Sequence, residues 1–175
     1  TTQNRINTGL KVGSAKDDGA AFAIAQSQRS TVSSLDAVKD SLSRATSVVD
    51  VASSAGEAVS DMLTQLKEKA LAASDTSLDT TSRSALQNDF ESIRDQITKT
   101  LTNASFNGIN LVDGSQASIS ALANADGSST LTVAGQDMSL GGSIVSLASD
   151  ATFATASSAG ALLSTLDDAI NSVSA

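Results

Sequence analysis

Cysteine, histidine, tryptophan, tyrosine and proline are all absent from this chain of 175 residues, and phenylalanine occurs only four times. Without cysteine the chain can form no disulfide, and without histidine as well it lacks the usual ligands of a zinc site. The absence of histidine also removes the common base of a serine nucleophile. The composition therefore argues against a zinc site and against a nucleophile that is activated by histidine.

Basic residues are also scarce, because 11 Lys and Arg stand against 19 Asp and Glu and give a net charge of −8. Binding to nucleic acid needs basic clusters that neutralise phosphates, so nucleic acid is not expected as a partner. No apolar run approaches the roughly 18 residues that a membrane-spanning helix requires. The sequence therefore predicts no membrane partner.

The most regular feature that is present is a heptad pattern from Gln28 to Ala70. Apolar or small residues repeat there at steps of three and four, as in a helix that packs along other helices. A helix over residues 20–73 would be about 80 Å long, whereas a compact domain of this size is about 35 Å across. The pattern therefore predicts an elongated protein that assembles with other chains. With Gln28 as the one polar exception, its two rows are Gln28, Leu35, Leu42, Val49, Gly56, Leu63 and Ala70, and Val38, Ala45, Ala52, Val59 and Leu66.

Two further helices are predicted, over residues 80–103 and 155–175. The first follows a short break after residue 73, so it should run antiparallel to the long helix, with Asp79 or Thr80 as its N-cap. The second has the helical period again after a region without it. We expect these helices to bury the C-terminal half of the seam, whereas the half near Ala21 to Leu35 should have fewer partners within this chain. The predicted core consists of Leu35, Leu42, Val49, Leu63, Leu66, Phe90, Ile93, Ile97 and Leu166.

Between these helices, residues 105–150 alternate with a period of two, which is typical of β-hairpins. Asn107-Gly108 and the stretch Asn124 to Gly127 are turn signals. Residues 1–19 are predicted to contain the end of one helix and the non-helical connection to the next. We predict a single, mainly α domain over residues 1–175: an elongated antiparallel bundle of two N-terminal helices and one C-terminal helix, with β-hairpins at the tip.

Three stretches of the sequence resemble bacterial flagellin. Residues 5–21 read Arg-Ile-Asn-Thr-Gly-Leu-Lys-Val-Gly-Ser-Ala-Lys-Asp-Asp-Gly-Ala-Ala, which is similar to the family's most diagnostic segment. Ser105-Phe106-Asn107-Gly108-Ile109-Asn110-Leu111-Val112 resembles the step that ends the family's second helix, and Leu162 to Val173 resembles the start of its C-terminal helix. The resemblance implies the rod-shaped core domain of a flagellin, trimmed of both terminal polymerisation segments and of the outer domains of larger flagellins.

The resemblance implies a structural subunit of the flagellar filament, which is exported through the flagellar secretion channel and assembles outside the cell for swimming motility. Its expected partners are other flagellin subunits and the flagellar export and capping proteins. This 175-residue chain by itself is expected to be monomeric. Two alternatives stay open: a hook–filament junction protein from the same apparatus, and a helical adhesin or adaptor that binds through the exposed seam.

The resemblance also assigns roles to individual residues of these motifs. The spoke and subunit-packing positions are Arg5, Lys16, Asp17, Asp18, Phe106 and Asn107. Asp17 and Asp18 admit a second interpretation, as a carboxylate pair for acid–base or metal chemistry. No further ligand converges on them in the sequence, and acidic residues suit a helix start, so capping and subunit contact are favoured.

The family further implies a surface on the first and second helices that a vertebrate innate-immune receptor recognises through an Arg and a Leu four residues apart and a Glu on the second helix. Ungapped alignment from the motifs places Gln65, Lys69 and Gln96 at these positions. Loss of such anchors can remove several kcal/mol of binding free energy. We therefore expect weak or no recognition by that receptor. The other interpretation is that these are ordinary solvent-facing helix positions.

Overall fold

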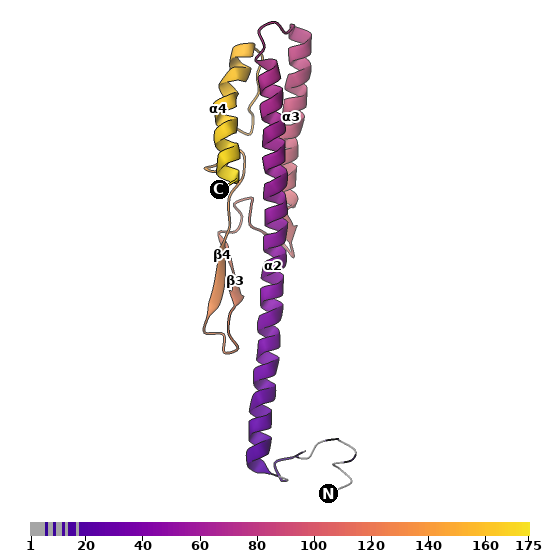
Figure 1. Cartoon of the computed structure of the whole chain (residues 1–175), viewed down its shortest axis with the longest axis vertical. Coiled ribbons are helices and arrows are strands. Elements are labelled where there is room, and N and C mark those ends of the chain that lie inside the picture. The colour runs from indigo at the N-terminus through magenta and orange to yellow at the C-terminus, as the bar shows by residue number, and fades with distance from the viewer. Residues whose placement is uncertain (1–5, 7–8, 10–11, 13, 17) are drawn as a thin grey trace. The chain divides into compact units, whose positions relative to one another are not determined.

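Helices and short hairpins make up the regular structure of the chain (Figure 1). The computed structural model describes residues 6, 9, 12, 14–16 and 18–175. The elements in chain order are α2 (Gly19–Ala73), α3 (Thr80–Asn103), β1 (Ser105–Phe106), β2 (Ile109–Asn110), β3 (Ser118–Leu122), β4 (Thr130–Ala134) and α4 (Ala156–Val173). This is the mainly α fold with a small β region that the periodicity predicts.

The described residues divide into two compact units. Unit 1 contains the chain up to Arg44 together with Ser120–Leu131, and unit 2 contains Ala45–Ile119 and Thr132–Ala175. The helix α2 contributes its N-terminal part to unit 1 and its C-terminal part to unit 2. Each unit is described by itself below.

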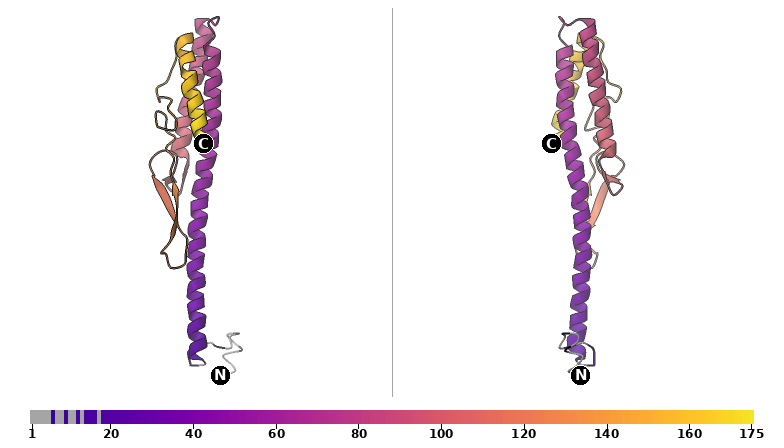
Figure 2. Two further views of the ribbon diagram at one scale, coloured as in Figure 1. Left: turned by 60° about the vertical axis from the view of Figure 1, so that its left-hand side comes forward. Right: turned by 90° about the vertical axis from the view of Figure 1, so that its right-hand side faces the viewer.

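Unit 2 is built on three helices that lie side by side. Figures 1 and 2 show α3 and α4 along the C-terminal part of α2, and both run antiparallel to it. Two ion pairs join the helices: Lys67 on α2 pairs with Asp167 on α4, and the Lys69 ammonium on α2 lies 2.6 Å from the Asp89 carboxylate on α3. Because these side chains are partly exposed, each pair contributes at most about 1 kcal/mol to stability.

The core of unit 2 consists of apolar side chains from all three helices and from the segment before α4. Phe90 and Phe153 meet edge to face at its centre, with ring centroids 5.2 Å apart. Ile93 is half-buried against the same core. Other fully buried members are Val59, Leu63, Leu66, Ile97, Val145, Leu147 and Leu166.

The connection between α2 and α3 is held by side chains that close both helix ends. Asp79 is the N-cap of α3 and accepts the Ser82 N–H at 2.9 Å, as expected. The Arg83 guanidinium donates to the carbonyl oxygens of Ala73, Asp75 and Leu78 at 2.9 to 3.0 Å. The last carbonyl groups of a helix have no partner within it, so Arg83 supplies donors that α2 itself lacks.

The β1–β2 hairpin has the two-residue turn that Asn107-Gly108 predicts. Ser105 pairs with Asn110 and Phe106 with Ile109. Asn107 and Gly108 have φ values of 52° and 78°, the left-handed conformation that Asn and Gly tolerate best and that a type I′ turn requires at both positions. The hairpin therefore reverses the chain directly after α3.

Asn110 fastens this hairpin to the end of α3. Its side-chain amide donates to the Leu101 carbonyl at 2.6 Å and its side-chain oxygen accepts the Val112 N–H at 2.9 Å, in a buried position. We expect Asn110→Ala to reduce the free energy of unfolding by about 1–3 kcal/mol, because it leaves buried backbone groups without partners. Chemical denaturation would measure this, and a change below the experimental error would show that the amide is replaced by water.

Candidate functional site

The N-terminal part of α2, in unit 1, presents large apolar side chains to solvent. Ile24, Val32 and Leu35 are 61%, 58% and 50% exposed. Ile24 and Leu35 lie eleven residues apart, which is about three helical turns, and therefore share a face, with Val32 beside them. We call these three residues the α2 stripe. Isolated exposed apolar residues are ordinary, but a row along one helix face indicates a packing surface.

The prediction that Leu35 belongs to the core is wrong for this chain. Leu35 is half exposed, whereas Leu42 and Val49 in the same heptad row are half-buried and Leu63 further along is fully buried. The heptad pattern marks a face that packs but cannot tell which partner covers it. In unit 2 the partners are α3, α4 and the segments that pack with them, and none of these elements belongs to unit 1.

Unit 1 also contains the outer part of the β3–β4 hairpin. The Leu122 N–H donates to the Ser41 hydroxyl of α2 at 3.1 Å. Val38 lies one turn before Ser41, and both Val38 and Ala121 are buried. Leu131 on β4 is 56% exposed. The hairpin thus covers the α2 face around Val38 and leaves the α2 stripe exposed.

The start of α2 has the geometry of a helix cap, made by Asp18. The Asp18 carboxylate accepts the Ala21 N–H at 3.0 Å, and the Asp18 carbonyl accepts the Phe22 N–H at 3.0 Å. Lys16 is exposed. Arg5 and Asp17, predicted at the same packing surface, lie outside the described residues. Nowhere in the described part of the chain do three or more acidic side chains gather into a group that could hold a metal ion.

The predicted packing residues of the second motif lie in the β1–β2 turn of unit 2. Phe106 is 38% exposed and Asn107 is exposed. The structure therefore places Phe106 and Asn107 in unit 2 and Lys16 and Asp18 in unit 1.

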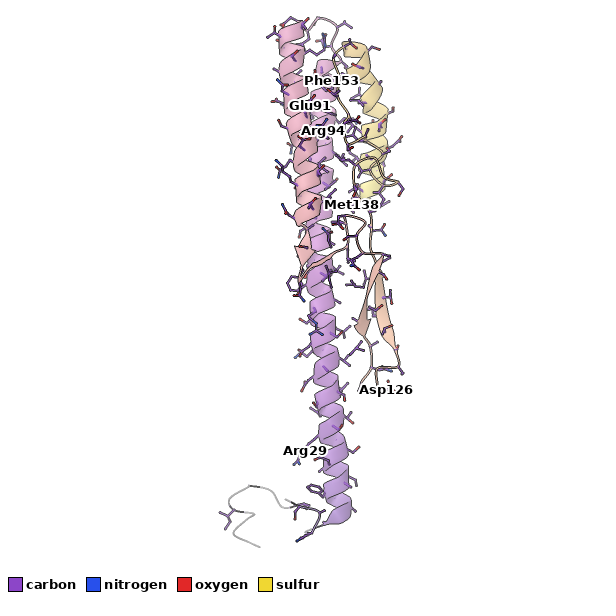
Figure 3. The ribbon with its side chains drawn as sticks, turned by 180° about the vertical axis from the view of Figure 1, so that it is seen from behind. Arg29, Glu91, Arg94, Asp126, Met138 and Phe153 are labelled. Atoms are coloured by element: carbon purple, nitrogen blue, oxygen red, sulfur yellow. The ribbon has the colours of Figure 1, made fainter. Side chains whose placement is uncertain are left out.

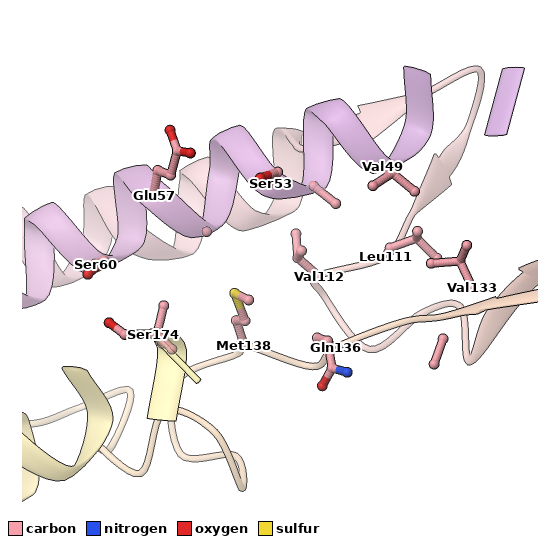
Figure 4. Close-up of a pocket in the computed structure, with 14 residues that line it drawn as sticks. Val49, Ser53, Glu57, Ser60, Leu111, Val112, Val133, Gln136, Met138 and Ser174 are labelled. Atoms are coloured by element: carbon pink, nitrogen blue, oxygen red, sulfur yellow. The ribbon is translucent and has the colours of Figure 1, made fainter. Parts of the chain in front are cut away.

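A hollow in unit 2 was not predicted from the sequence. It has a volume of about 410 Å³ and lies between α2, the chain after β2, the segment after β4 and the end of α4 (Figure 4). Gly56 of α2 faces Met138 across it, because a Cβ added at Gly56 would lie 3.5 Å from the Met138 methyl carbon. Glu57 is its one charged residue, and the remaining lining is apolar or small apart from Gln136.

A polar clamp on α3, also missed in the sequence, holds the segment before α4. The Arg94 guanidinium donates to the Ala151 carbonyl at 2.8 Å, and the Thr152 hydroxyl donates to the Glu91 carboxylate at 2.7 Å. Gln87 also donates to Glu91, and these hydrogen bonds hold the pKa of the Glu91 carboxyl below its ordinary value. Figure 3 shows Glu91 and Arg94 on α3 near Phe153. The clamp keeps Phe153 against Phe90.

Several loops are closed by the same short signal, an Asp followed two residues later by a Ser. Asp75, Asp113, Asp126 and Asp137 each accept the N–H of that Ser at 2.8 to 3.0 Å. In this way Ser77 lowers the pKa of Asp75 from 3.8, and Ser139 lowers that of Asp137. The Asp-x-Ser spacing could have revealed these turns in the sequence.

Because the pKa values of these carboxyl groups are lowered in the folded chain, the free energy of unfolding should change with pH in the acid range. A group whose pKa is lower in the folded than in the unfolded chain stabilises the fold above its unfolded pKa, and this stabilisation is lost as the pH falls through the folded value. We therefore expect wild type to be more stable than Asp75→Asn at pH 7, and the difference to shrink below the unfolded value of 3.8. Urea unfolding of both proteins at pH 7 and pH 3 measures it. A difference that is equal at both pH values would contradict the assignment.

The positions aligned with the immune-receptor surface lie on α2 and α3 of unit 2. Gln65 and Gln96 are exposed, and Lys69 is half-buried and paired with Asp89. The structure thus places two neutral amides and an already paired ammonium on these two helices. Separately, none of the helices among the described residues is long and apolar enough to cross a membrane.

Comparison with known proteins gives consistent matches. The family described as bacterial flagellin N-terminal helical region matches residues 1–117. Flagellin FljM and flagellin FljK of Caulobacter vibrioides are each 51% identical, over 96% and 97% of this chain and 60% and 61% of their own lengths. The chain therefore spans about 60% of these relatives.

A solved structure shares the fold at much lower identity. The crystal structure of Bacillus cereus flagellin matches with a TM-score of 0.66 and 19% identity, over 78% of this chain and 77% of that chain. At this identity the match supports the arrangement of helices and hairpins and carries no information on individual site residues.

Proposed function

Because this chain belongs to the bacterial flagellin family, we propose that it is a structural subunit of the flagellar filament, assembling with other flagellin subunits into a helical tubular polymer. The observation that supports this most is the α2 stripe, because Ile24, Val32 and Leu35 are exposed there, whereas Leu63, in the same heptad row as Leu35, is buried further along the helix. A subunit surface is expected to have such a row, since assembly buries it. The subunit acts outside the cell in swimming motility, after export through the flagellar secretion channel, and has export and capping proteins as transient partners.

The role needs no catalytic group and no cofactor. Asp18 serves as a helix cap, and the hollow beside Met138 is lined almost entirely by apolar and small residues. We propose that Arg5, Lys16, Asp17 and Asp18, together with Phe106 and Asn107, contact neighbouring subunits. The 51% identity to flagellins favours this function over a hook–filament junction protein. The same identity also disfavours an adhesin or adaptor.

A substitution on the α2 stripe tests the proposal. Leu35→Asp, in a chain extended by the flanking segments of a longer relative, should prevent incorporation into seeded filaments, because assembly would bury an unpaired charge. Its monomer should keep its melting temperature, since Leu35 is half exposed. Ser30→Asp adds the same charge to another face of α2 and serves as the control. Normal incorporation of Leu35→Asp would contradict a packing role for the stripe.

We further propose that the chain activates the innate-immune flagellin receptor weakly or not at all. The proposal rests on Gln65, Lys69 and Gln96 at the aligned positions, where neither the guanidinium nor the aliphatic anchor is present. A reporter-cell assay of the purified chain should show little response, and the triple change Gln65→Arg, Lys69→Leu and Gln96→Glu should raise it. A strong response of the unchanged chain would refute this proposal without affecting the filament function.

A further inference from the structure

The turn residue Asn107 combines three properties that bear on its chemical stability. Asn107-Gly108 is the one place in the 175 residues where Asn precedes Gly. Both residues are exposed at the turn between β1 and β2. A glycine after Asn leaves the next backbone nitrogen unshielded, because no side chain stands beside it. The backbone nitrogen of Gly108 is therefore sterically accessible to the Asn107 side chain.

The Asn107 side chain also makes no hydrogen bond to any residue in the described part of the chain. In contrast, the Asn110 amide is buried and bonded at both ends, and the Asn124 amide bonds to Ser128 and Ser129. The three Asp-Gly pairs, at Asp18, Asp113 and Asp126, have carboxylates that each accept a backbone N–H. Asn107 is therefore the turn residue whose side-chain carbonyl carbon is least restrained.

We propose that Asn107 is a self-modification site that deamidates spontaneously to isoaspartate and opens the β1–β2 hairpin. The backbone nitrogen of Gly108, on losing its proton, attacks the side-chain carbonyl carbon of Asn107. The new C–N bond closes a five-membered succinimide ring, and the amide C–N bond breaks to release ammonia, which carries the proton away. Water then adds to one of the two ring carbonyl carbons, and the bond from that carbon to the ring nitrogen breaks. The product is isoaspartate or aspartate, with no oxidation or reduction.

The hairpin is short enough to open for this reaction. Each strand has two residues, and a hairpin of this size is marginally stable by itself. The left-handed backbone at Asn107 is held by the turn, so local opening frees the geometry that ring closure needs. The expected rate rises with pH, because the attacking nitrogen must lose its proton.

The product cannot keep the turn. Isoaspartate adds a carbon atom to the main chain between Phe106 and Gly108, so a two-residue turn no longer brings Phe106 opposite Ile109 and Ser105 opposite Asn110. The carboxylate also adds a negative charge to a chain of net charge −8. Because Asn110 fastens the hairpin to Leu101, the isoaspartate form should be less stable than the unmodified chain.

Ageing the purified chain at 37 °C and pH 8.5 tests the proposal without any assembly step. Peptide mass spectrometry and labelling by an isoaspartate methyltransferase should show the product growing at Asn107, faster than at Asp113 or Asp126, with a falling melting temperature. Asn107→Gly keeps a turn that tolerates positive φ and has no amide to cyclise, so its aged form should stay unlabelled there and keep its melting temperature.

Two outcomes would overturn the inference. Product at Asn107 in the urea-unfolded chain but none in the folded chain over the same period would show that the turn protects it. Product that appears first at Asp126 or at another asparagine would show that side-chain freedom at the β1–β2 turn does not select the site. Neither outcome bears on filament assembly.

Discussion

Replacing Phe90 with alanine is expected to lower the free energy of unfolding by about 3–5 kcal/mol, the usual cost of removing a large aromatic side chain from a core. Phe90 is fully buried on α3 and meets Phe153 edge to face. Its loss leaves a cavity between the helices and removes the contact that the polar clamp of Arg94 positions. Thermal and urea unfolding of the variant measure the effect.

Leu71→Ala is the matched control for this prediction. Leu71 lies near the end of α2 and is 57% exposed, so its truncation should change stability by no more than about 0.5 kcal/mol. Equal losses for Phe90→Ala and Leu71→Ala would show that the three-helix core of unit 2 does not dominate stability.

Gly135→Ala is expected to destabilise the chain by about 3 kcal/mol, at the upper end of ordinary overpacking. A Cβ at Gly135 would lie 2.2 Å from the Gln116 carbonyl oxygen. The neighbouring backbone has little freedom to move, because the Gln136 and Met138 N–H groups donate to the carbonyl groups of Leu111 and Val112 at 2.7 and 2.9 Å. Denaturation curves of the variant and of wild type measure the loss.

For Gly160→Ala, the same glycine-to-alanine change, we expect the opposite effect on stability. Gly160 lies inside α4, and its added methyl would make an ordinary contact at 3.8 Å with the Ser74 Cβ. Alanine in a helix interior is favoured over glycine by about 0.5–1 kcal/mol. We therefore expect a stability gain for Gly160→Ala. A loss at Gly160 as large as that at Gly135 would show that contact geometry does not explain the difference.

The sequence predicts the elements of this fold well because their signals are local. The helical period identifies α2, α3 and α4, Asp79 marks the start of α3, and Asn107-Gly108 specifies the β1–β2 turn. These features depend on neighbouring residues and on backbone preferences. The Asp-x-Ser turns were also readable in principle, since their hydrogen bonds span only two residues.

Features that depend on distant segments could not be predicted in the same way. Leu35 and Leu63 occupy the same heptad row, yet only Leu63 is covered by partners within the chain. The clamp of Glu91 and Arg94 on the segment before α4 joins residues about 60 positions apart. The close approach of Gly135 to Gln116 could be predicted only if the paths of both segments were known. Periodicity identifies a face that packs, and only the fold shows what packs on it.

Burial of the α2 stripe by assembly is tested most directly by seeded polymerisation followed by electron microscopy. The chain extended with the flanking segments of a longer relative should form filaments, the 175-residue chain alone should remain monomeric, and Leu35→Asp in the extended chain should block growth while Ser30→Asp does not. Filament formation by the 175-residue chain alone, or unimpaired growth of the extended Leu35→Asp chain, would contradict the claim.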